Sequence, residues 1–217
     1  MKENIPFFKY QGTGNDFIII DGRSQKFFDY SNHEIISKMC HRRFGIGADG
    51  LIIIESGFDD INFVMQYFNS DGRPSSMCGN GGRCITKAAE KLGIINKQAT
   101  FKFNEELYVA KINPENDSVR LKMQAVEKLE EYEDSYVLDT GSPHFVRFQN
   151  DVRRHSVDKA GAEIRYSEHF KEKGINVNFC EWIDNKLFVR TYERGVEAET
   201  YSCGTGVVAS AIAFSNM

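Results

Sequence analysis

Two cysteines, Cys78 and Cys203, each stand directly before a Gly-x-Gly triplet. A stretch rich in small residues follows each triplet and predicts a helix, so each thiol is expected at a helix amino terminus. Free N–H groups and the helix macrodipole favour negative charge at that end. The thiol pKa, about 8.5 in free cysteine, would fall towards neutrality and supply thiolate. The same N–H groups can hold a substrate carboxylate, and the glycines let the backbone approach it closely.

A thiolate and a thiol on opposite faces of an α-carbon can invert its configuration. One sulfur removes the proton and the other returns one. Because the α-proton of an amino acid is far less acidic than a thiol, the developing carbanion needs electrostatic stabilisation, which preorganised N–H donors at the carboxylate supply. Such chemistry requires no electron-sink cofactor.

Both cysteines belong to an internal repeat. Phe63–Tyr67 precede the first Cys-Gly-x-Gly and Phe188–Tyr192 precede the second, at the same offset, since 78 minus 63 and 203 minus 188 each give 15. A weaker similarity relates Thr13-Gly14-Asn15 to Thr140-Gly141-Ser142. The repeat predicts that the chain consists of two halves with the same fold.

Two similar halves can pack about a pseudo-twofold axis, where equivalent loops meet and binding sites tend to lie. We therefore expect an α/β (α+β) fold of two lobes, residues 1–122 carrying Cys78 and residues 123–217 carrying Cys203. The active site is expected in the cleft between the lobes. The acidic stretch Glu127–Ser135 is typical of a connection between halves.

The periodicity of apolar residues predicts the elements that position these loops. A helix is expected from His33, behind an Asn32 cap, and another after Gly82, which Gly93 ends. Short β-branched or aromatic runs predict strands, namely Phe17–Asp21, Leu51–Ile54, Phe63–Phe68, Leu107–Ile112 and Val119–Met123.

The composition limits partners and location. A net charge of −4 and a pI near 5.8, with scattered Lys and Arg, exclude the basic footprint of a nucleic-acid binder. Apolar runs such as Phe17–Ile20 are far shorter than the roughly 20 residues that span a bilayer. Met1–Gln11 lacks the apolar core of a signal peptide. We expect a cytoplasmic protein with a small-molecule amino acid as its partner and no membrane partner. The sequence leaves the oligomeric state open, with a homodimer as one candidate.

The remaining cysteines, Cys40, Cys84 and Cys180, lie in apolar stretches and are expected in the core. A reducing compartment and an odd cysteine count disfavour structural disulfides. No Cys-x-x-Cys or matching histidine pair is present, so no metal site is expected.

Eight sequence blocks together resemble the diaminopimelate epimerase family over nearly the whole chain. They are Gly12–Phe17, Arg43–Asp49, Asn69–Gly72, Met77–Cys84, Pro143-His144, Asn176-Val177, Tyr192–Gly195 and Ser202–Gly206. The resemblance implies two α/β lobes, each a mixed sheet wrapped around a central helix. It also implies interconversion of L,L- and meso-diaminopimelate, for lysine and peptidoglycan precursors, without pyridoxal phosphate or metal.

The resemblance implies a role for each matching residue. Cys78 would deprotonate the L,L-isomer and Cys203 would reprotonate it, with these roles reversed in the other direction. His144 and Glu193 would manage the thiol protons. Backbone groups would hold the α-carboxylate and polar side chains the distal amino acid end; the backbone residues are Gly79, Asn80, Gly204 and Thr205, and the distal residues are Asn15, Asn69, Asn176 and Arg194.

Four features depart from the family pattern. Ser142 stands where many members have Asn, and Gly50 where some have Gln. The loop Val196–Glu199 is one residue longer than the commonest form. Members usually continue with further strands after the second catalytic helix, so we expect either that the sequence is truncated at Met217 or that its lobes close differently.

Two other functions stay open at this point. A proline or hydroxyproline racemase would use the same two-thiol inversion. Its substrate has no distal amino acid end, so it has no need of Asn69, Asn176 and Arg194 to bind one. A redox module in which Cys78 and Cys203 form a reversible disulfide would need no epimerase activity.

Overall fold

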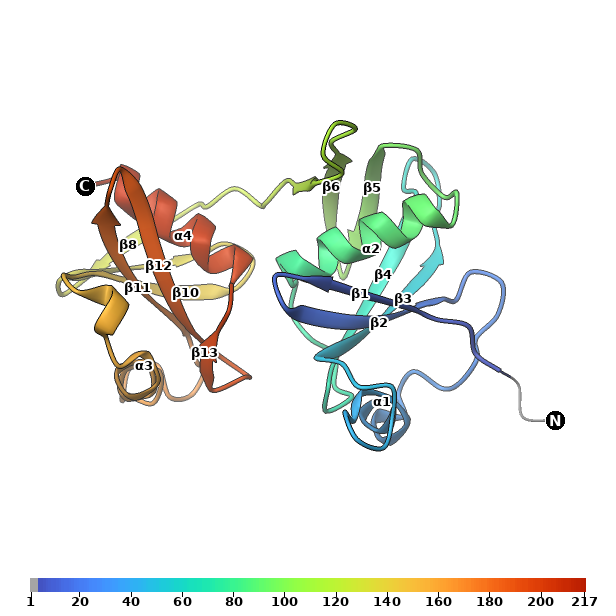
Figure 1. Cartoon of the computed structure of the whole chain (residues 1–217), viewed down its shortest axis with the longest axis horizontal. Helices are drawn as coiled ribbons and strands as arrows, with labels where there is room; N and C mark the ends of the chain where they lie inside the picture. Colours follow the sequence, from blue (N-terminus) through green and yellow to red (C-terminus); the bar gives the residue numbers. More distant parts are fainter. Residues whose placement is uncertain (1–3) are drawn as a thin grey trace. The chain divides into compact units, whose positions relative to one another are not determined.

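A computed structural model describes residues 4–217. The chain divides into two compact units, unit 1 (Met1–Lys122) and unit 2 (Met123–Met217). Each unit has its own sheet and its own helices (Figure 1).

In the described part of unit 1, seven strands form one sheet in the order β1-β2-β3-β4-β5-β6-β7. The pairs β2/β3 and β4/β5 are parallel and the other pairs are antiparallel. Each parallel pair needs a crossover, and a helix occupies each one. The elements are β1 (Phe8–Gly12), β2 (Asn15–Asp21), α1 (His33–Cys40), β3 (Gly50–Ser56), β4 (Phe63–Asn69), α2 (Gly79–Lys91), β5 (Gln98–Phe103), β6 (Glu106–Ile112) and β7 (Val119–Leu121).

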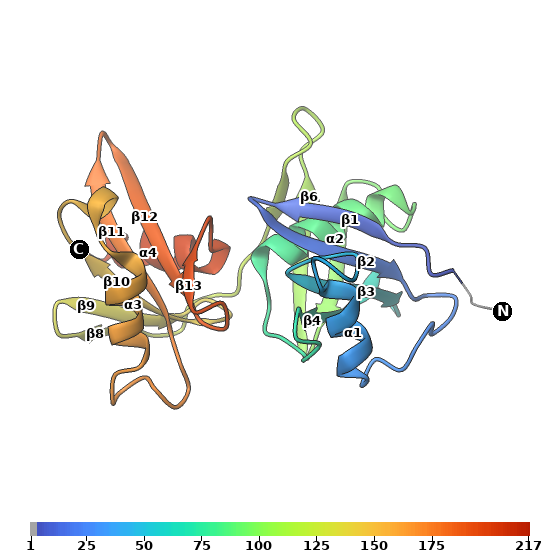
Figure 2. The same ribbon diagram turned by 60° about the horizontal axis from the view of Figure 1, so that its bottom comes forward.

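The sheet of unit 1 wraps around α2, which contacts the edge strands β1 and β7 as well as β2, β3 and β6 (Figure 1). Side chains alternate between the two faces of a strand, so Phe17 and Ile19 of β2 pack with α2 while Ile18 and Ile20 pack with α1 on the outer face. Figure 2 shows α1 and α2 on the two sides of this sheet. The alternation explains why β2 reads as a continuous apolar run.

In unit 2, six strands form a sheet in the order β13-β12-β11-β10-β9-β8. Only β10 and β11 are parallel, and their crossover contains the 3₁₀ turn η1 and α3. The elements are β8 (Leu129–Tyr132), β9 (Ser135–Asp139), β10 (Pro143–Phe148), η1 (Val152–Arg154), α3 (Val157–Arg165), β11 (Asn176–Ile183), β12 (Lys186–Glu193), β13 (Ala198–Thr200) and α4 (Gly204–Ser215).

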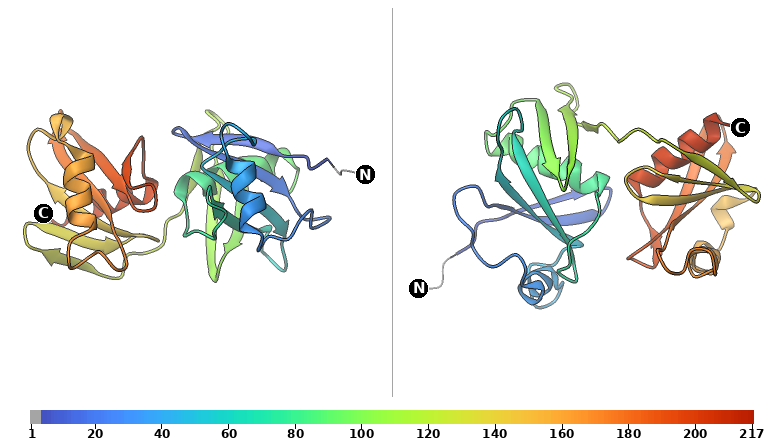
Figure 3. Two further views of the ribbon diagram at one scale, coloured as in Figure 1. Left: turned by 90° about the horizontal axis from the view of Figure 1, so that it is seen from below. Right: turned by 180° about the vertical axis from the view of Figure 1, so that it is seen from behind.

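The two helices of unit 2 pack on opposite faces of its sheet (Figure 3). Phe145, Val177 and Phe179 are buried with α3, while Val146 and Cys180 are buried with α4. Unit 2 therefore repeats the layering of unit 1, in which one helix covers the outer face and a small-residue helix lies against the other.

The predicted duplication of the fold is confirmed by the order of the elements. The run β1-β2-α1-β3-β4-α2 corresponds to β9-β10-α3-β11-β12-α4, with β13 inserted before the last helix. The two Thr-Gly segments, at residues 13–14 and 140–141, also occupy corresponding places, because each lies in the turn of a hairpin. Thr13 contacts Asn80 through its hydroxyl oxygen, 3.3 Å from Asn80 Oδ1, and Thr140 donates to the carbonyl of Thr205 at 2.9 Å.

One predicted element was wrong. The acidic stretch Glu127–Ser135 was expected to connect the halves, but Leu129–Tyr132 form β8 of unit 2. Leu129 and Tyr132 are partly buried on opposite faces, Leu129 with α4 and Tyr132 with α3. The acids between them are exposed on an edge strand, where charge is common because it discourages pairing with other chains.

The start of α2 also differs from the prediction, since the helix begins at Gly79, before Gly82. Packing overrides the low helix propensity of glycine here. A Cβ on Gly82 would lie 2.7 Å from Met77 Cε and 2.9 Å from Leu121 Cδ2, so glycine lets these two side-chain ends pack directly against the helix. The cap of α1 was predicted correctly, and Asn32 Oδ1 accepts from the Ile35 N–H at 3.2 Å.

Among residues 4–217, no helix has the length and apolar character that crossing a membrane requires.

The core of unit 1 gives a first prediction. Ile85 of α2 is fully buried, so Ile85→Ala should lower the free energy of unfolding by about 2–5 kcal/mol, from lost burial and the cavity left behind. Ile35→Ala on α1, where the side chain is 39% exposed, is the matched control and should cost under about 1 kcal/mol. Urea unfolding followed by circular dichroism measures both, and equal losses would contradict this packing.

Candidate active site

Both repeated cysteines are N-cap residues. Cys78 precedes α2 and Cys203 precedes α4, each in an extended backbone conformation. Neither makes a side-chain cap hydrogen bond, and the first turn of each helix contains no acidic residue. The first N–H groups of a helix have no partner within the helix. Each cysteine thus stands beside donors suited to an anion, as the sequence predicts.

In unit 1, the half-site around Cys78 is built from α2 and the β1–β2 turn. Cys78 is partly exposed, and its Sγ lies 3.4 Å from Asn15 Oδ1, which can only accept. Asn80 Nδ2 approaches the same oxygen at 3.5 Å. Arg83 donates to Asn80 Oδ1 and so holds the carboxamide of Asn80. Three of the predicted residues, Cys78, Asn15 and Asn80, are thereby brought together.

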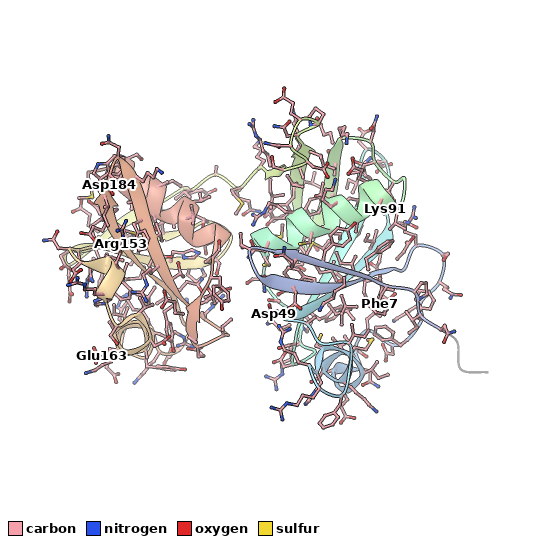
Figure 4. The ribbon with its side chains drawn as sticks, in the orientation of Figure 1. Phe7, Asp49, Lys91, Arg153, Glu163 and Asp184 are labelled. Atoms are coloured by element: carbon pink, nitrogen blue, oxygen red, sulfur yellow. The ribbon has the colours of Figure 1, made fainter. Side chains whose placement is uncertain are left out.

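Behind Asn15 lies a charged cluster of Lys9, Asp16, Arg42 and Asp49. Asn15 Nδ2 donates to Asp49 Oδ2 at 3.0 Å, so Asp49 turns the carboxamide oxygen of Asn15 towards Cys78. Arg42 bonds both oxygens of Asp16, at 3.2 and 2.8 Å, and reaches Asp49 Oδ1 at 2.6 Å. Figure 4 labels Asp49 where the chain enters β3.

The pKa of Asp16 reflects this cluster. Burial alone would raise it, but hydrogen bonds from Arg42, Lys9 and Asp49 outweigh burial and hold the pKa far below its usual range. The carboxylate therefore stays charged throughout the neutral range and keeps its two cations in place.

Asn69 and Gly50 lie side by side at the same end of two adjacent strands of the unit 1 sheet. Asn69 closes β4 two residues after Tyr67 and pairs in register with Gly50. A Cβ on Gly50 would lie 2.6 Å from Phe68 O and from Tyr67 Cε2. The position at which some relatives are expected to have Gln therefore has no space for a side chain here.

In unit 2, the half-site around Cys203 is more deeply buried. Cys203 is 7% exposed, and its Sγ lies 3.3 Å from Thr205 Oγ1. His144 Nε2 lies 2.8 Å from the same hydroxyl. Burial, with a smaller contribution from Arg194, lowers the pKa of the fully buried His144 to about 3. His144 is thus a neutral imidazole at physiological pH, and the hydroxyl of Thr205 lies between its ring and the Cys203 thiol.

The other predicted residues of unit 2 lie close to this group. Asn176 Nδ2 donates to Ser142 Oγ at 2.8 Å and to Pro143 O at 3.0 Å, and Asn176 Oδ1 accepts from the Arg194 N–H at 2.8 Å. Arg194 Nη1 donates to Lys173 O at 3.0 Å. Asn176 therefore ties Ser142 and Arg194 to one edge of the sheet.

Glu193 and Gly204 complete the predicted set. Glu193 ends β12 and accepts from Thr200 Oγ1 at 2.9 Å. Gly204 is the first residue of α4, directly after Cys203, as Gly79 is the first residue of α2.

Three further residues support the half-sites and were not singled out by the sequence. Asp49 lies inside a block that carries the family resemblance, which was the available signal. Arg83 sits five residues after Cys78, on the first turns of the helix. Asn178 is fully buried in the apolar strand β11, and an asparagine between Val177 and Phe179 was its only signal.

The cysteines expected in the core are buried there. Burial raises the pKa of Cys40, Cys84 and Cys180 to about 11 in each case. None of the five cysteines forms a disulfide within residues 4–217. Among residues 4–217, no group of three or more His, Cys, Asp or Glu side chains is arranged to hold a metal ion.

Solved structures define the class of fold. A phenazine biosynthesis protein of the PhzF family from Bacillus anthracis matches with a TM-score of 0.69 at 15% identity, over 94% of this chain and 78% of its own. A hydroxyproline epimerase from Agrobacterium vitis, with bound trans-4-hydroxy-L-proline, matches with a TM-score of 0.67 at 12% identity, over 97% and 76%. The fold is that of this two-lobed α+β group.

Sequence comparison then gives the family. The chain belongs to the diaminopimelate epimerase family, whose model matches residues 7–129 and 136–216. The diaminopimelate epimerase of Flavobacterium psychrophilum is 50% identical over 207 residues, which are 95% of this chain and 80% of that protein. The enzyme of Aquifex aeolicus is 38% identical over 222 residues, with the same two shares. The chain is thus an isomerase of the epimerase type.

Burial of three cysteines predicts which thiols react. Iodoacetamide at about pH 8 should alkylate Cys78 and Cys203, while Cys40, Cys84 and Cys180 stay protonated and inaccessible. Peptide mass spectrometry measures the extent at each site. All five should react in urea, and labelling of Cys84 as fast as Cys78 in the native protein would contradict the assignment.

The charged cluster predicts a dependence of stability on pH. A carboxyl whose pKa is depressed by folding stabilises the fold above its unfolded pKa of about 3.9, and loses that effect as pH falls. Asp16→Asn should therefore lower the free energy of unfolding at pH 7, and the difference from the unmodified protein should shrink below about pH 4. A constant difference from pH 7 to pH 3, measured by urea unfolding, would rule out this origin.

Proposed function

We propose that the chain interconverts L,L- and meso-diaminopimelate, with Cys78 and Cys203 as the two acid–base groups. The observation that carries the proposal is the equivalence of the two cysteines. Both are N-cap residues of the small-residue helix of their unit, and neither caps that helix with its own side chain. The family membership supports the substrate.

The reaction needs one thiolate and one thiol. In the L,L-to-meso direction Cys78 Sγ takes the α-proton, so a C–H bond breaks and an S–H bond forms. The electron pair left on carbon is delocalised into the carboxylate. The carboxylate accepts hydrogen bonds from the backbone N–H groups of Gly79 and Asn80 in α2 and of Gly204 and Thr205 in α4. Such fixed donors stabilise developing charge without reorganisation. The Cys203 thiol then protonates the opposite face, and the roles reverse for the meso substrate.

His144 and Glu193 support the proton balance of Cys203. Because His144 is neutral, its contribution is a hydrogen bond through Thr205, without the field of a cation. Glu193 is fixed by Thr200 at the end of β12, next in the chain to Arg194. These contacts favour a role in tuning the thiol over a role in taking the substrate proton directly.

We propose that the distal amino acid end is read by Asn15, Asn69, Asn176 and Arg194. A guanidinium matches a carboxylate bidentately, and carboxamides can both donate to a carboxylate and accept from an ammonium group. Asn176 fixes the backbone of Arg194, and that contact supports placing the guanidinium for this purpose.

Cysteine acid–base chemistry and N–H donors account for every step, so we propose that neither pyridoxal phosphate nor a metal takes part. The proposed setting is the cytoplasm, with a free amino acid as the partner and no nucleic acid or membrane. A homodimer is proposed as the assembly.

The function is tested by incubating the protein with L,L-diaminopimelate in deuterated water. The meso product should carry deuterium at the inverted carbon, and activity should survive chelator and hydroxylamine treatment. Cys78→Ser and Cys203→Ser should each lower kcat by about 10²–10⁴-fold, the usual contribution of a general acid or base.

Cys40→Ala, a buried thiol on α1, is the matched control and should retain activity. Turnover of proline or hydroxyproline without diaminopimelate turnover would assign a different substrate. No solvent deuterium in the product of the reduced, intact protein would reject the two-thiol mechanism, and reversible disulfide formation without any isomerisation would identify a redox module.

A further inference from the structure

The two units differ in the layer that lies beneath the start of each small-residue helix. In unit 2 this layer contains His144, Asn178 and Thr191, of which the first two are fully buried and the third is 4% exposed. His144 and Asn178 lie on neighbouring strands, and Asn178 pairs in register with Thr191. Three polar side chains in one buried layer are costly unless each is hydrogen-bonded.

In unit 1 the corresponding layer is Phe17, Ile52 and Tyr67. The equivalence follows from the helix glycines, because a Cβ on Gly81 would meet Ile52 Cδ1 at 3.2 Å, while a Cβ on Gly206 would meet Asn178 Oδ1 at 2.3 Å. Ile52 pairs in register with Tyr67, as Asn178 does with Thr191. The fold therefore does not require polar groups at this place.

The carboxamide of Asn178 has one possible orientation. Its Nδ2 lies 2.9 Å from Phe145 O, and a carbonyl oxygen can only accept. On the other side Asn178 Oδ1 accepts from Thr191 Oγ1 at 2.9 Å. Both contacts agree, so Nδ2 must be the atom that faces His144.

This orientation determines the tautomer of His144. Asn178 Nδ2 lies 3.0 Å from His144 Nδ1, and because the amide nitrogen donates, Nδ1 must carry a lone pair. A neutral ring then has its proton on Nε2. That proton is donated to Thr205 Oγ1 at 2.8 Å, which leaves the Thr205 hydroxyl hydrogen free to point elsewhere.

Thr205 Oγ1 lies 3.3 Å from Cys203 Sγ, where either atom could in principle donate. We propose that Asn178 is a positioning residue that fixes the Nε2–H tautomer of His144 and thereby directs the Thr205 hydroxyl hydrogen onto Cys203 Sγ. The sulfur then accepts, and a hydrogen bond to the charged form favours thiolate. The inference rests on the proposed role of Cys203 in proton transfer.

The half-site of unit 1 has the opposite hydrogen-bond polarity. Asn15 Nδ2 is held by Asp49, so Asn15 Oδ1 faces Cys78 and the sulfur must donate to it. Acceptance by Asn15 favours the thiol form of Cys78, whereas donation by Thr205 favours the thiolate of Cys203. The proposed reaction needs one thiolate and one thiol, and these contacts favour that pair of protonation states before any substrate binds.

Few charges act on the His144 ring. Helix α4 carries no acidic or basic residue, and the residues of β11 on this face are Asn176, Asn178, Cys180 and Trp182, none of which carries a charge at neutral pH. Arg194 is the charged group that affects the ring, and together with burial it keeps His144 neutral. The neutral ring and its single tautomer hold over the pH range in which the thiols work.

The tautomer can be tested in the unmodified protein, with no substitution at Asn178. Long-range proton–nitrogen correlations of protein labelled with ¹⁵N-histidine report which ring nitrogen is protonated, and His144→Gln assigns the signals. The expected result is a neutral ring with the proton on Nε2, unchanged from about pH 6 to 8. A proton on Nδ1, or a charged ring, would overturn the proposal whether or not the protein is an epimerase.

The effect on Cys203 is tested by titrating its thiolate absorbance in a Cys78→Ser background, with the double variant that also carries Cys203→Ser as the blank. Cys40, Cys84 and Cys180 stay silent because burial raises the pKa of each to about 11. Asn178→Asp should move the ring proton to Nδ1 and raise the Cys203 midpoint by about one pH unit. Asn178→Leu, which adds no charge, should raise it as well.

Ser210→Ala is the control for packing, since Ser210 is buried on α4 and donates to Gly206 O at 2.7 Å. It should leave the ring tautomer and the Cys203 midpoint unchanged. A shift with Asn178→Asp but not with Asn178→Leu would be an effect of charge alone and would refute the positioning role. An unchanged midpoint in both folded variants would refute it equally.

Discussion

The first turn of a helix has N–H groups that the helix itself cannot satisfy, and both small-residue helices of this protein present that turn beside a cysteine. The N-cap position is normally filled by Ser, Thr, Asp or Asn, whose oxygen bonds to these N–H groups. Cys78 and Cys203 make no such bond. The protein forgoes the stability of a side-chain cap at two places, and helix N–H groups of this kind are suited to an anionic ligand. The remainder of each unit serves to hold that turn in position.

The sheets hold the turns by close contact with α2 and α4, and the two units achieve this with different chemistry. Unit 1 packs Ile52 beneath Gly81, where the contact is apolar and does not depend on the orientation of any hydrogen-bond donor. Unit 2 packs Asn178 beneath Gly206, and the carboxamide of Asn178 is held there by directed hydrogen bonds. A duplicated fold can thus give its two halves the same geometry and unlike electrostatics, which suits the proposed reaction between one thiolate and one thiol.

Local signals in the sequence were sufficient for much of the fold. The Asn32 cap, the apolar run of β2 and the repeated Cys-Gly-x-Gly all depend on residues close together in the chain. Leu129–Tyr132 were missed as a strand because the two acids between them hide the alternation. Asn178 was missed for a different reason. Its partners, Phe145 and Thr191, lie on other strands, so nothing adjacent in the sequence marks it as more than a polar residue in an apolar run.

The wrapping of unit 1 around α2 has a consequence for the way the chain folds. The helix contacts β1, near the start of the unit, and β7, at its end. Contacts between segments so far apart in sequence are slow to form, because the entropy of closing the loop must be lost before they contribute. During synthesis α2 leaves the ribosome with its β1 face covered and its β7 face bare. Helix α2 therefore takes its final position only when Val119–Leu121 has joined the edge of the sheet.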